Sequence, residues 1–345
     1  NLFGNGQFVR LRLAGSLERM QIDLSFTEPR FLDRNLSAGF DLYHKEIDMR
    51  DQAGFRQRKS GGQLRLGFPL AENLWMQTSY GLSRDQIFDV EDFASRAIKN
   101  GCGFVVTDNV TGAGQCTEDA YWTSLVGTSI TYDGRNHPRN PTRGIYLQLD
   151  DEFAGLGGDT QYWRVNAEGR AYYPLTEKIT LIGRVIGGHI EGWGGDDVRL
   201  LDMYFKGGET IRGFDRAGYG PRDLFTGDAL GGQTYWAATA EVRFPLPFIP
   251  EDIGLSGAVF ADAGSLWGSG DFAAASNNCA DNSQFTNGSF RNICLADDST
   301  IRSSVGASLM WNSPVGPLRM DFAKVLSKQA YDEEQMFRFG ASTKF

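Results

Sequence analysis

The chain has 345 residues, a net charge of −9 and a sequence pI near 5.0. This acidic balance argues against a nucleic-acid-binding surface, and no run approaches the roughly 20 apolar residues of a membrane-spanning helix. The mean hydropathy of −0.34 does not exclude a membrane, because a spanning barrel alternates apolar and polar side chains. The chain opens in turn-like residues without a signal peptide, so we expect a fragment or a mature segment.

Apolar and polar residues alternate along most of the chain, and this period of two predicts strands. Val9, Leu11 and Leu13, for example, alternate with Arg10 and Arg12. The pattern predicts about fourteen strands, with no convincing amphipathic helix. The strands are expected roughly at 9–13, 20–26, 36–43, 59–69, 73–86, 121–133, 143–153, 160–173, 177–190, 233–246, 253–267, 300–312, 316–327 and 335–345.

The connections between these strands fall into two classes. Short ones are predicted at 28–34, 69–73, 174–178, 245–252 and 313–317, and long polar ones at 45–58, 87–120, 191–232 and 268–299. Bacterial outer-membrane barrels have long extracellular loops at one end and short periplasmic turns at the other. A soluble β-sandwich would sort its loops in this way only by chance. We therefore predict an all-β fold, a transmembrane antiparallel barrel formed by one domain over residues 1–345.

The charged faces of the predicted strands are expected to line the inside of the barrel. Glu241 and Arg243 lie on the face opposite Val242, and Asp262 lies opposite Val259. A Lys or Arg turned toward lipid at mid-depth costs about 2–4 kcal/mol, which favours an inward orientation for such faces. A half-exposed soluble sheet shows the same alternation in one strand, so the inference depends on the whole series.

The loop at 191–232 contains a Gly-rich, charged stretch at 206–223 that is too long for a hairpin turn. Structureless loops of this length are uncommon unless they are functional or disordered. We predict that it folds into the barrel and that Arg212 meets carboxylates on the inner wall. The alternative is a solvated loop whose arginine has no role.

Four cysteines form two local pairs, Cys102 with Cys116 and Cys279 with Cys294. Their spacing is not that of zinc ligands, and two disulfides that close loops of about 15 residues are the better explanation, each worth roughly 3 kcal/mol. Such bonds persist in an oxidising compartment such as the periplasm or the cell surface. Four free thiols in a cytosolic protein are the alternative.

The sequence carries no signature of hydrolytic or redox chemistry. Its three histidines are widely scattered, no serine lies in a Gly-x-Ser-x-Gly motif, and no phosphate-binding Gly-x-x-x-x-Gly-Lys loop is present. We therefore expect no enzymatic activity, no cofactor and no metal site.

Four motifs, in order, resemble the barrel of the BamA family of outer-membrane protein assembly insertases. Residues 211–214 resemble its Val-Arg-Gly-Phe loop motif, 262–267 its Asp-x-Gly-x-x-Trp strand, and 313–322 its turn before the penultimate strand. The chain also stops on an aromatic residue, Phe345. The resemblance covers essentially the whole chain and is strongest from residue 205 onward.

The resemblance implies a barrel of sixteen strands, of which about fourteen are present here. The first two strands and the periplasmic POTRA domains are expected to be absent, and the final glycine, Gly340, lies one position further from the terminus than the family pattern has it. The implied function is the folding and insertion of β-barrel proteins into the bacterial outer membrane, without nucleotide. The implied partners are unfolded outer-membrane proteins, accessory lipoproteins of the assembly complex, and the lipid and lipopolysaccharide of the membrane.

The loop motif consists of Ile211, Arg212, Gly213 and Phe214. We expect Arg212 to contact Glu241 and Asp262. Gly213 would allow a sharp turn of the backbone, and Phe214 would pack next to Arg212. In the family the first and last strands form a weak seam used for insertion. The seam strand here is 335–345, whose apolar face would be turned to lipid and whose glycine would pack poorly. Its seam residues are Phe337, Phe339, Gly340 and Phe345. An ordinary closing strand is the alternative.

Two other functions remain open from the sequence. A two-partner-secretion pore shares the Arg-Gly-Phe loop and exports one partner protein, and a TamA-like translocation and assembly protein is a related alternative. A secreted lectin-like β protein is a third class, and extraction without detergent would favour it.

Overall fold

The structure is a computed structural model that describes residues 6–16, 18–107, 114–117, 120–247, 249–250, 253–270, 279, 285–286, 289–290, 293–313 and 316–341. In this part of the chain no helix has the length and apolar character needed to cross a membrane. The dominant feature is a single sheet of fourteen strands.

Each strand of this sheet pairs antiparallel with the next one along the chain that belongs to it. The prediction of about fourteen strands is therefore confirmed. The strands are β1 Phe8–Gly15, β2 Arg19–Glu28, β3 Ser37–Asp48, β4 Arg56–Ala71, β5 Leu74–Phe88, β8 Tyr121–Asp133, β9 Gly144–Gly158, β10 Tyr162–Pro174, β11 Thr180–Gly192, β13 Thr234–Pro245, β14 Leu255–Trp267, β18 Arg302–Ser313, β19 Gly316–Ser327 and β20 Phe337–Ala341.

The alternation in the sequence corresponds to two chemically different faces of the sheet. On β9 the side chains of Leu147 and Leu149 are exposed on the convex face. On β10, Arg164 points inward and pairs with Glu152 at 3.1 Å. Because successive strand residues point to opposite faces, the period of two produces an apolar exterior and a polar interior. This distribution is that of a membrane-spanning barrel.

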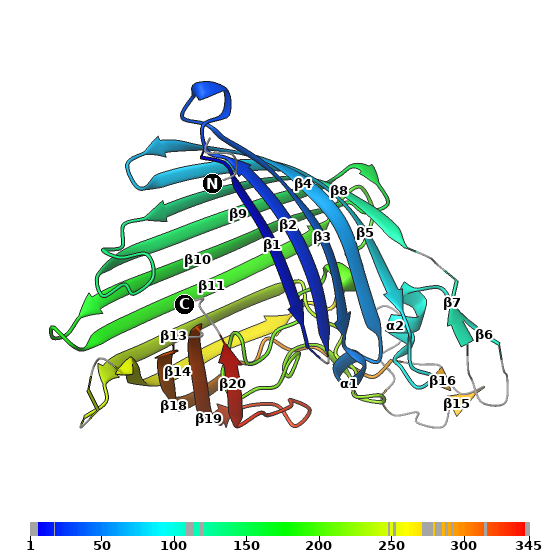
Figure 1. The fold of residues 1–345 in the computed structure, drawn as a ribbon. Coiled ribbons are helices and arrows are strands. Elements are labelled where there is room, and N and C mark those ends of the chain that lie inside the picture. The colour runs from blue at the N-terminus through cyan, green and yellow to red at the C-terminus, as the bar shows by residue number, and fades with distance from the viewer. Residues whose placement is uncertain are drawn as a thin grey trace.

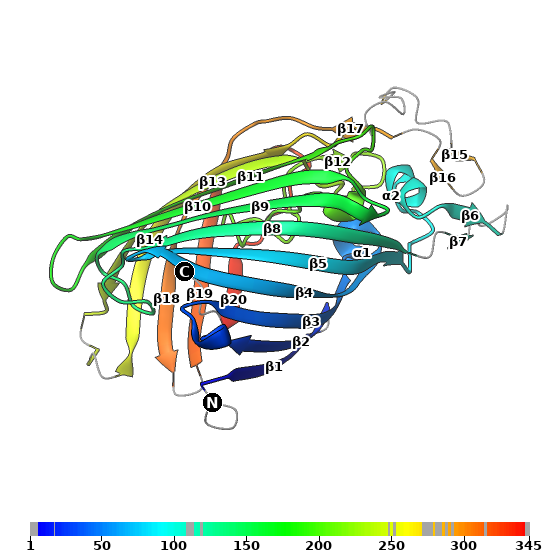
Figure 2. The ribbon, with the colours of Figure 1, turned by 90° about the horizontal axis from the view of Figure 1, so that it is seen from above.

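The sheet is curled but open among the described residues. β1 pairs only with β2, and β20 pairs only with β19. Figures 1 and 2 show that the sheet curves until these two edge strands lie on the same side of the molecule, with the loops of the interior between them. Among the described residues, β1 and β20 are therefore the two edge strands of the sheet.

The connections sort to the two ends, as predicted. Figure 2 shows the helices and small strands of the long loops gathered at one end, away from the turns at the other. These elements are α1 Arg50–Ala53, α2 Arg96–Gly101, the 3-10 helix η2 Leu200–Asp202, β6 Phe104–Val106, β7 Gly114–Cys116, β12 Arg222–Asp223, β15 Phe285–Thr286, β16 Ser289–Phe290 and β17 Leu295–Ala296. We call this end the cap end and the other the turn end.

The predicted long loop at 45–58 is wrong. β3 continues to Asp48 and β4 begins at Arg56, so the connection contains only 49–55, with α1 inside it. The polar residues that suggested a loop form cross-strand ion pairs instead, such as Arg58 with Glu46 at 2.5 Å. Opposite charges on neighbouring strands stabilise a ladder that the composition alone does not reveal.

The cap end has a hydrophobic core of its own. It gathers buried residues from four connections and from the end of β5: Met49, Ala53, Phe55, Ile87, Ala97, Ile98, Cys102, Leu200, Ala217, Ala229, Leu230 and Ile293. Two disulfides, Cys102–Cys116 and Cys279–Cys294, close loops in this region. The sequence-predicted pairing is therefore present, and the long loops form a packed layer over the barrel.

Candidate functional site

The connection between β11 and β13 carries the Arg-Gly-Phe motif and turns back into the barrel. Gly207 lies so close to the returning chain that a Cβ there would meet the carbonyl oxygen of Asp215 at 1.9 Å. Gly213 adopts a φ of 97°, a conformation that other residues rarely take. These two glycines make a tight loop whose tip, 211–214, is buried.

Arg212 binds the inner wall of the barrel through both of its predicted partners. Its Nε and Nη2 each donate to a different oxygen of Asp262 at 2.7 Å, and its backbone N–H donates to the same carboxylate at 3.0 Å. Its Nη1 donates to Glu241 at 2.7 Å. The bidentate geometry to one carboxylate is the strong form of a charge-assisted hydrogen bond.

The guanidinium of Arg212 also lies over the ring of Phe260, 3.4 Å from its centroid. Burial by itself lowers the pKa of Arg212, but the hydrogen bonds and charges of Asp262 and Glu241 outweigh this and raise it. The loop therefore carries a permanent positive charge into a site of two buried carboxylates, and that charge holds the loop on β13 and β14.

A second arginine extends this site toward the last strands. Arg319 of β19 donates to Glu241 at 2.9 Å and to Asp321 at 2.6 Å, and Arg243 shares Glu241 at 2.9 Å. Glu241 thus sits among three guanidinium groups. Sequence reasoning missed Arg319 as a member of the site, although its place on the charged face of 316–327 was a usable signal.

The apolar residues of the motif pack beside the ionic site. Ile211 and Phe214 are fully buried with Tyr219, Tyr235 and Leu266, and the rings of Phe214 and Tyr219 meet edge to face at 5.3 Å. Burial of two large apolar side chains favours the folded-in loop by about 1.5–3 kcal/mol each. The loop is consequently held by packing as well as by charge.

The loop tip also pairs with the connection that precedes the last strand. Asp215 N–H donates to the Glu333 carbonyl at 3.0 Å, Glu333 N–H donates to Gly218 at 2.8 Å, and Gln335 N–H donates to Gly213 at 2.9 Å. Arg222 pairs with the Glu333 carboxylate, and Arg338 of β20 pairs with Glu209 at 3.1 Å. The loop therefore lies directly against one edge of the open sheet.

One residue of the same loop reaches the other edge. Arg216 Nη1 donates to the Glu18 carboxylate at 3.1 Å and to the Asp48 carbonyl at 3.2 Å. Glu18 lies in the connection between β1 and β2. Asp215 and Arg216, neighbours in sequence, thus contact the connections next to the two edge strands, a pairing that no local sequence pattern indicates.

The seam strand shows the predicted division of faces where it is described. Phe337 and Phe339 are exposed on the outside, and Gly340 has no atom within 4 Å of where a Cβ would stand. Its cross-strand neighbour on β19 is Arg319. Phe345 lies outside the described residues.

Three residues of the loop, Asp202, Tyr204 and Lys206, form a further contact with the barrel wall. Asp202 is buried, its carbonyl accepts from Arg164 at 2.7 Å, and burial raises the pKa of its carboxyl. The Lys206 ammonium lies 3.7 Å from the ring centroid of Tyr235 and 5.1 Å from that of Tyr204. Burial lowers the pKa of Lys206 to about 8.

Among the described residues, no group of three or more His, Cys, Asp or Glu side chains is arranged to hold a metal ion. The carboxylates of the site are instead occupied by arginines.

The chain matches known proteins over its whole length. The Omp85 superfamily domain matches residues 1–345. The outer membrane protein assembly factor BamA of Neorickettsia risticii is 28% identical over 355 residues, covering 99% of this chain and 43% of that protein. BamA of Neisseria meningitidis serogroup B is 27% identical, covering 100% of this chain and 44% of that protein.

A solved structure shares the fold. The crystal structure of BamA from Haemophilus ducreyi lacking POTRA domains 1–3 matches with a TM-score of 0.80 at 24% identity, covering 97% of this chain and 64% of that chain. This chain spans less than half the length of the two relatives named above. The domain match over every residue gives the family: this chain belongs to the Omp85 superfamily.

Proposed function

We propose that this chain belongs to the membrane barrel of an outer-membrane protein assembly factor, which folds and inserts β-barrel proteins along its last strand, β20. The relatives that it resembles carry that name. The observation that carries the proposal is the backbone pairing of the 213–218 segment with 333–335, directly beside the edge strand.

The physical requirement for insertion is that an entering strand satisfies its backbone groups before it meets lipid. Each unpaired group costs several kcal/mol in hydrocarbon. An edge strand such as β20, which pairs only with β19 among the described strands, offers a row of donors and acceptors to a new strand. Burial and hydrogen bonding of the client drive the step, so neither nucleotide nor cofactor is needed.

The loop would determine the position of this edge. It contacts the 328–336 connection through its backbone, and its ionic site reaches β19 through Glu241 and Arg319. Gly340 places no side chain opposite Arg319, so at this position β20 is held by its backbone ladder alone. This position is the weakest point of the pairing between β20 and β19, where the strand can part from its neighbour or accept another.

The proposed setting is the bacterial outer membrane, with the cap end extracellular and the turn end periplasmic. The oxidised cysteine pairs lie at the cap end and suit an extracellular environment. The proposed partners are unfolded outer-membrane β-barrel proteins, accessory lipoproteins of an assembly complex, and the surrounding lipid and lipopolysaccharide.

A reconstituted insertion assay tests the proposal. The protein in liposomes is mixed with a urea-unfolded β-barrel client, and the folded client is measured over time against empty liposomes. Faster folding supports the proposal, and the Arg216→Glu variant should alter the rate, because it breaks the contact with Glu18. A large open conductance in bilayers without accelerated folding would overturn it and favour a protein-exporting pore.

A further inference from the structure

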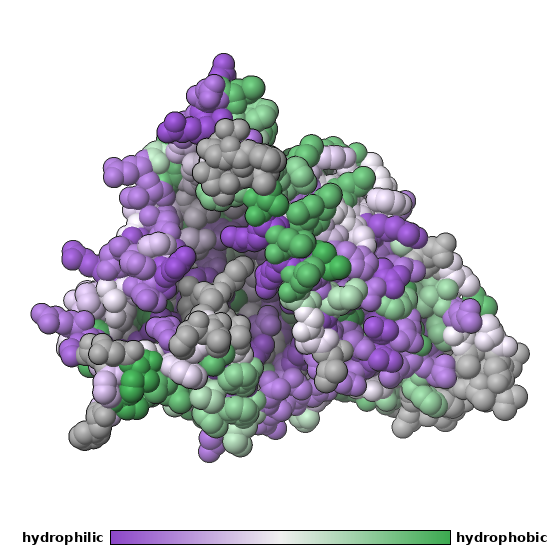
Figure 3. Space-filling model, viewed as in Figure 1, coloured by the Kyte–Doolittle hydropathy of each residue, from purple (hydrophilic) through white to green (hydrophobic). Residues whose placement is uncertain are grey.

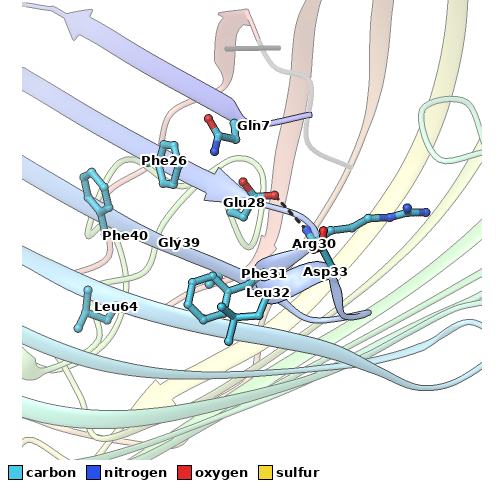
Figure 4. A pocket seen from close by; sticks show the side chains of 11 residues that line it. Gln7, Phe26, Glu28, Arg30, Phe31, Leu32, Asp33, Gly39, Phe40 and Leu64 are labelled. Carbon is cyan, nitrogen blue, oxygen red and sulfur yellow. Dashed lines mark hydrogen bonds between the residues drawn. The ribbon is translucent and has the colours of Figure 1, made fainter. Parts of the chain in front are cut away.

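The turn between β2 and β3 holds an apolar groove on the outside of the barrel. The groove has a volume of about 720 Å³, and its apolar lining comes from Phe26 of β2, Phe40 of β3, Leu64 of β4, and Phe31 and Leu32 of the turn. Figure 4 shows these side chains around one depression, with the rings of Phe26 and Phe40 on neighbouring strands. The groove continues the lipid-facing surface of the strands to the turn end of the barrel.

The turn is built to hold its apolar residues outward. Its 3-10 helix, η1 Phe31–Asp33, has Leu32 and Asp33 at a φ of 56° each, which non-glycine residues seldom adopt. The turn is closed by its own backbone bonds, from Phe31 N–H to the Leu36 carbonyl at 2.8 Å and from Arg34 N–H to the Phe31 carbonyl at 3.2 Å. Leu32 nevertheless remains 73% exposed. The left-handed conformation of the turn places the Leu32 side chain on the outside of the barrel.

Charged groups lie on the far side of this turn. Figure 4 shows Arg30 reaching away from the apolar side chains, past the end of β2. The backbone N–H of Arg30 donates to Glu28 at 3.2 Å, but no described residue pairs with its guanidinium or with the Asp33 carboxylate. Figure 3 shows the same projection at the top of the molecule, hydrophobic on one side and hydrophilic on the other. Beyond the apolar groove the turn therefore carries two exposed arginines, Arg30 and Arg34, and the exposed carboxylate of Asp33, while Glu28 at the groove edge accepts from the Arg30 N–H.

We propose that this turn binds a zwitterionic phospholipid with a primary amine headgroup. An acyl chain lies in the apolar groove against Phe40, Leu64 and Leu32. The phosphate accepts hydrogen bonds from Arg30, and the headgroup ammonium donates to Asp33. Along the turn the apolar groove comes first and the charged side chains lie beyond it. This matches the order of acyl chain, phosphate and ammonium along such a lipid.

The proposal depends on the membrane embedding of the barrel and not on its role in assembly, so the two can fail separately. The distinction between lipids is chemical. A primary ammonium donates hydrogen bonds to a carboxylate, a choline headgroup has no N–H to donate, and a glycerol headgroup leaves the Asp33 charge unmatched.

The test is lipid retention by native mass spectrometry. The purified chain, delipidated in detergent, is offered equimolar phosphatidylethanolamine, phosphatidylcholine and phosphatidylglycerol with identical acyl chains. We expect phosphatidylethanolamine to be retained about two- to fivefold over phosphatidylcholine, the gain of an exposed ionic contact. Asp33→Asn should bring that ratio to about one, and Arg30→Glu should weaken retention of both lipids.

Leu32→Asp should lower retention of all three lipids by roughly tenfold, the effect of losing one large apolar contact. Two matched controls at the same end of the barrel lie outside the groove: Leu175→Asp, at another exposed leucine, and Arg139→Glu, at another exposed arginine. Equal retention of the amine and choline lipids by the unmodified protein would overturn the proposal. So would losses in Arg30→Glu no larger than those in Arg139→Glu, a comparison that stays informative if Leu32→Asp does not fold.

Discussion

Arg212 and Asp262, fifty residues apart in sequence, are joined by three hydrogen bonds, two from the guanidinium and one from the backbone N–H. The side-chain bonds fix the plane of the guanidinium, and the backbone bond fixes the start of the turn at Gly213. A single carboxylate on β14 thus sets both the position and the direction of the loop tip. The further contacts of the loop, with Glu333 on one side and Glu18 on the other, depend on this placement.

Replacement of Arg212 by alanine should release the loop without unfolding the barrel. Removing one partner of a buried ion pair costs about 3–5 kcal/mol, because the remaining carboxylates are left uncompensated. Limited proteolysis should show new cleavage within 200–230, and client assembly should slow. Arg199→Ala is the matched control, since this arginine lies in the same connection and donates to an exposed carbonyl. Unchanged cleavage and unchanged assembly in Arg212→Ala would refute the role given to the motif.

The two carboxylates that bind Arg212 should have different effects on the seam. Glu241 also binds Arg319, next to β20, whereas Asp262 binds the guanidinium and the backbone N–H of Arg212. Glu241→Gln should therefore speed hydrogen exchange across 316–341, while Asp262→Asn should act mainly on the loop. Hydrogen-exchange mass spectrometry of both variants measures this. Equal protection of 316–341 in the two variants would show that Glu241 does not couple the loop to β19 and β20.

The Cys279–Cys294 disulfide should stabilise the cap end through Asp223. The Cys294 N–H donates to Asp223 at 3.2 Å, and the Leu224 N–H donates to the Cys294 carbonyl at 2.8 Å. Replacing both cysteines by serine should cost roughly 3 kcal/mol locally and expose 221–224 to protease. The Cys102→Ser, Cys116→Ser pair should instead expose the connection that holds α2. If both variants show the same cleavage pattern, the Cys279–Cys294 disulfide does not stabilise 221–224 through Asp223.

Lys206 should make stability depend on pH above neutrality. Burial lowers the pKa of Lys206 to about 8, below the ordinary value of 10.5, so the unfolded chain binds more protons between these values. The free energy of unfolding must then rise with pH across this window. The penalty at pH 7 is up to about 3 kcal/mol and is reduced by solvent screening.

Lys206→Met removes that penalty and provides the comparison. The variant should be more stable than the parent at pH 7.5, with a difference that shrinks toward pH 10, measured by urea unfolding in detergent. The stacking of Lys206 on Tyr235 and Tyr204 opposes this trend, because it favours the charged form. A difference that does not change between pH 7.5 and 10 would place the titration of Lys206 outside this window.

The strands were predictable because their signal is local. Trp163, Val165 and Ala167 alternate with Arg164, Asn166 and Glu168 within one segment, and the sheet places them on opposite faces. The error at 45–58 has the same origin. A run such as Lys45, Glu46 and Asp48 resembles a polar loop until its partners on the next strand are known.

The site was predictable in part. Arg212 carried a recognisable motif, and Glu241 and Asp262 could be assigned to inner faces from their parity along the strand. Arg319 has the same parity signal, but nothing in the sequence says that β19 comes within reach of the loop. The same holds for Arg216 and Glu18, which are 198 positions apart.

By itself, the sequence determined the strands, their two faces, the sorting of the connections and the arginine that enters the barrel. These depend on the period of two and on the cost of charge in lipid, which act residue by residue. Only the tertiary structure decided that one loop contacts both edges of the open sheet and that Glu241 is shared among three arginines. Those contacts join residues from distant strands, and their distances depend on the curvature of the whole sheet, which no local pattern encodes.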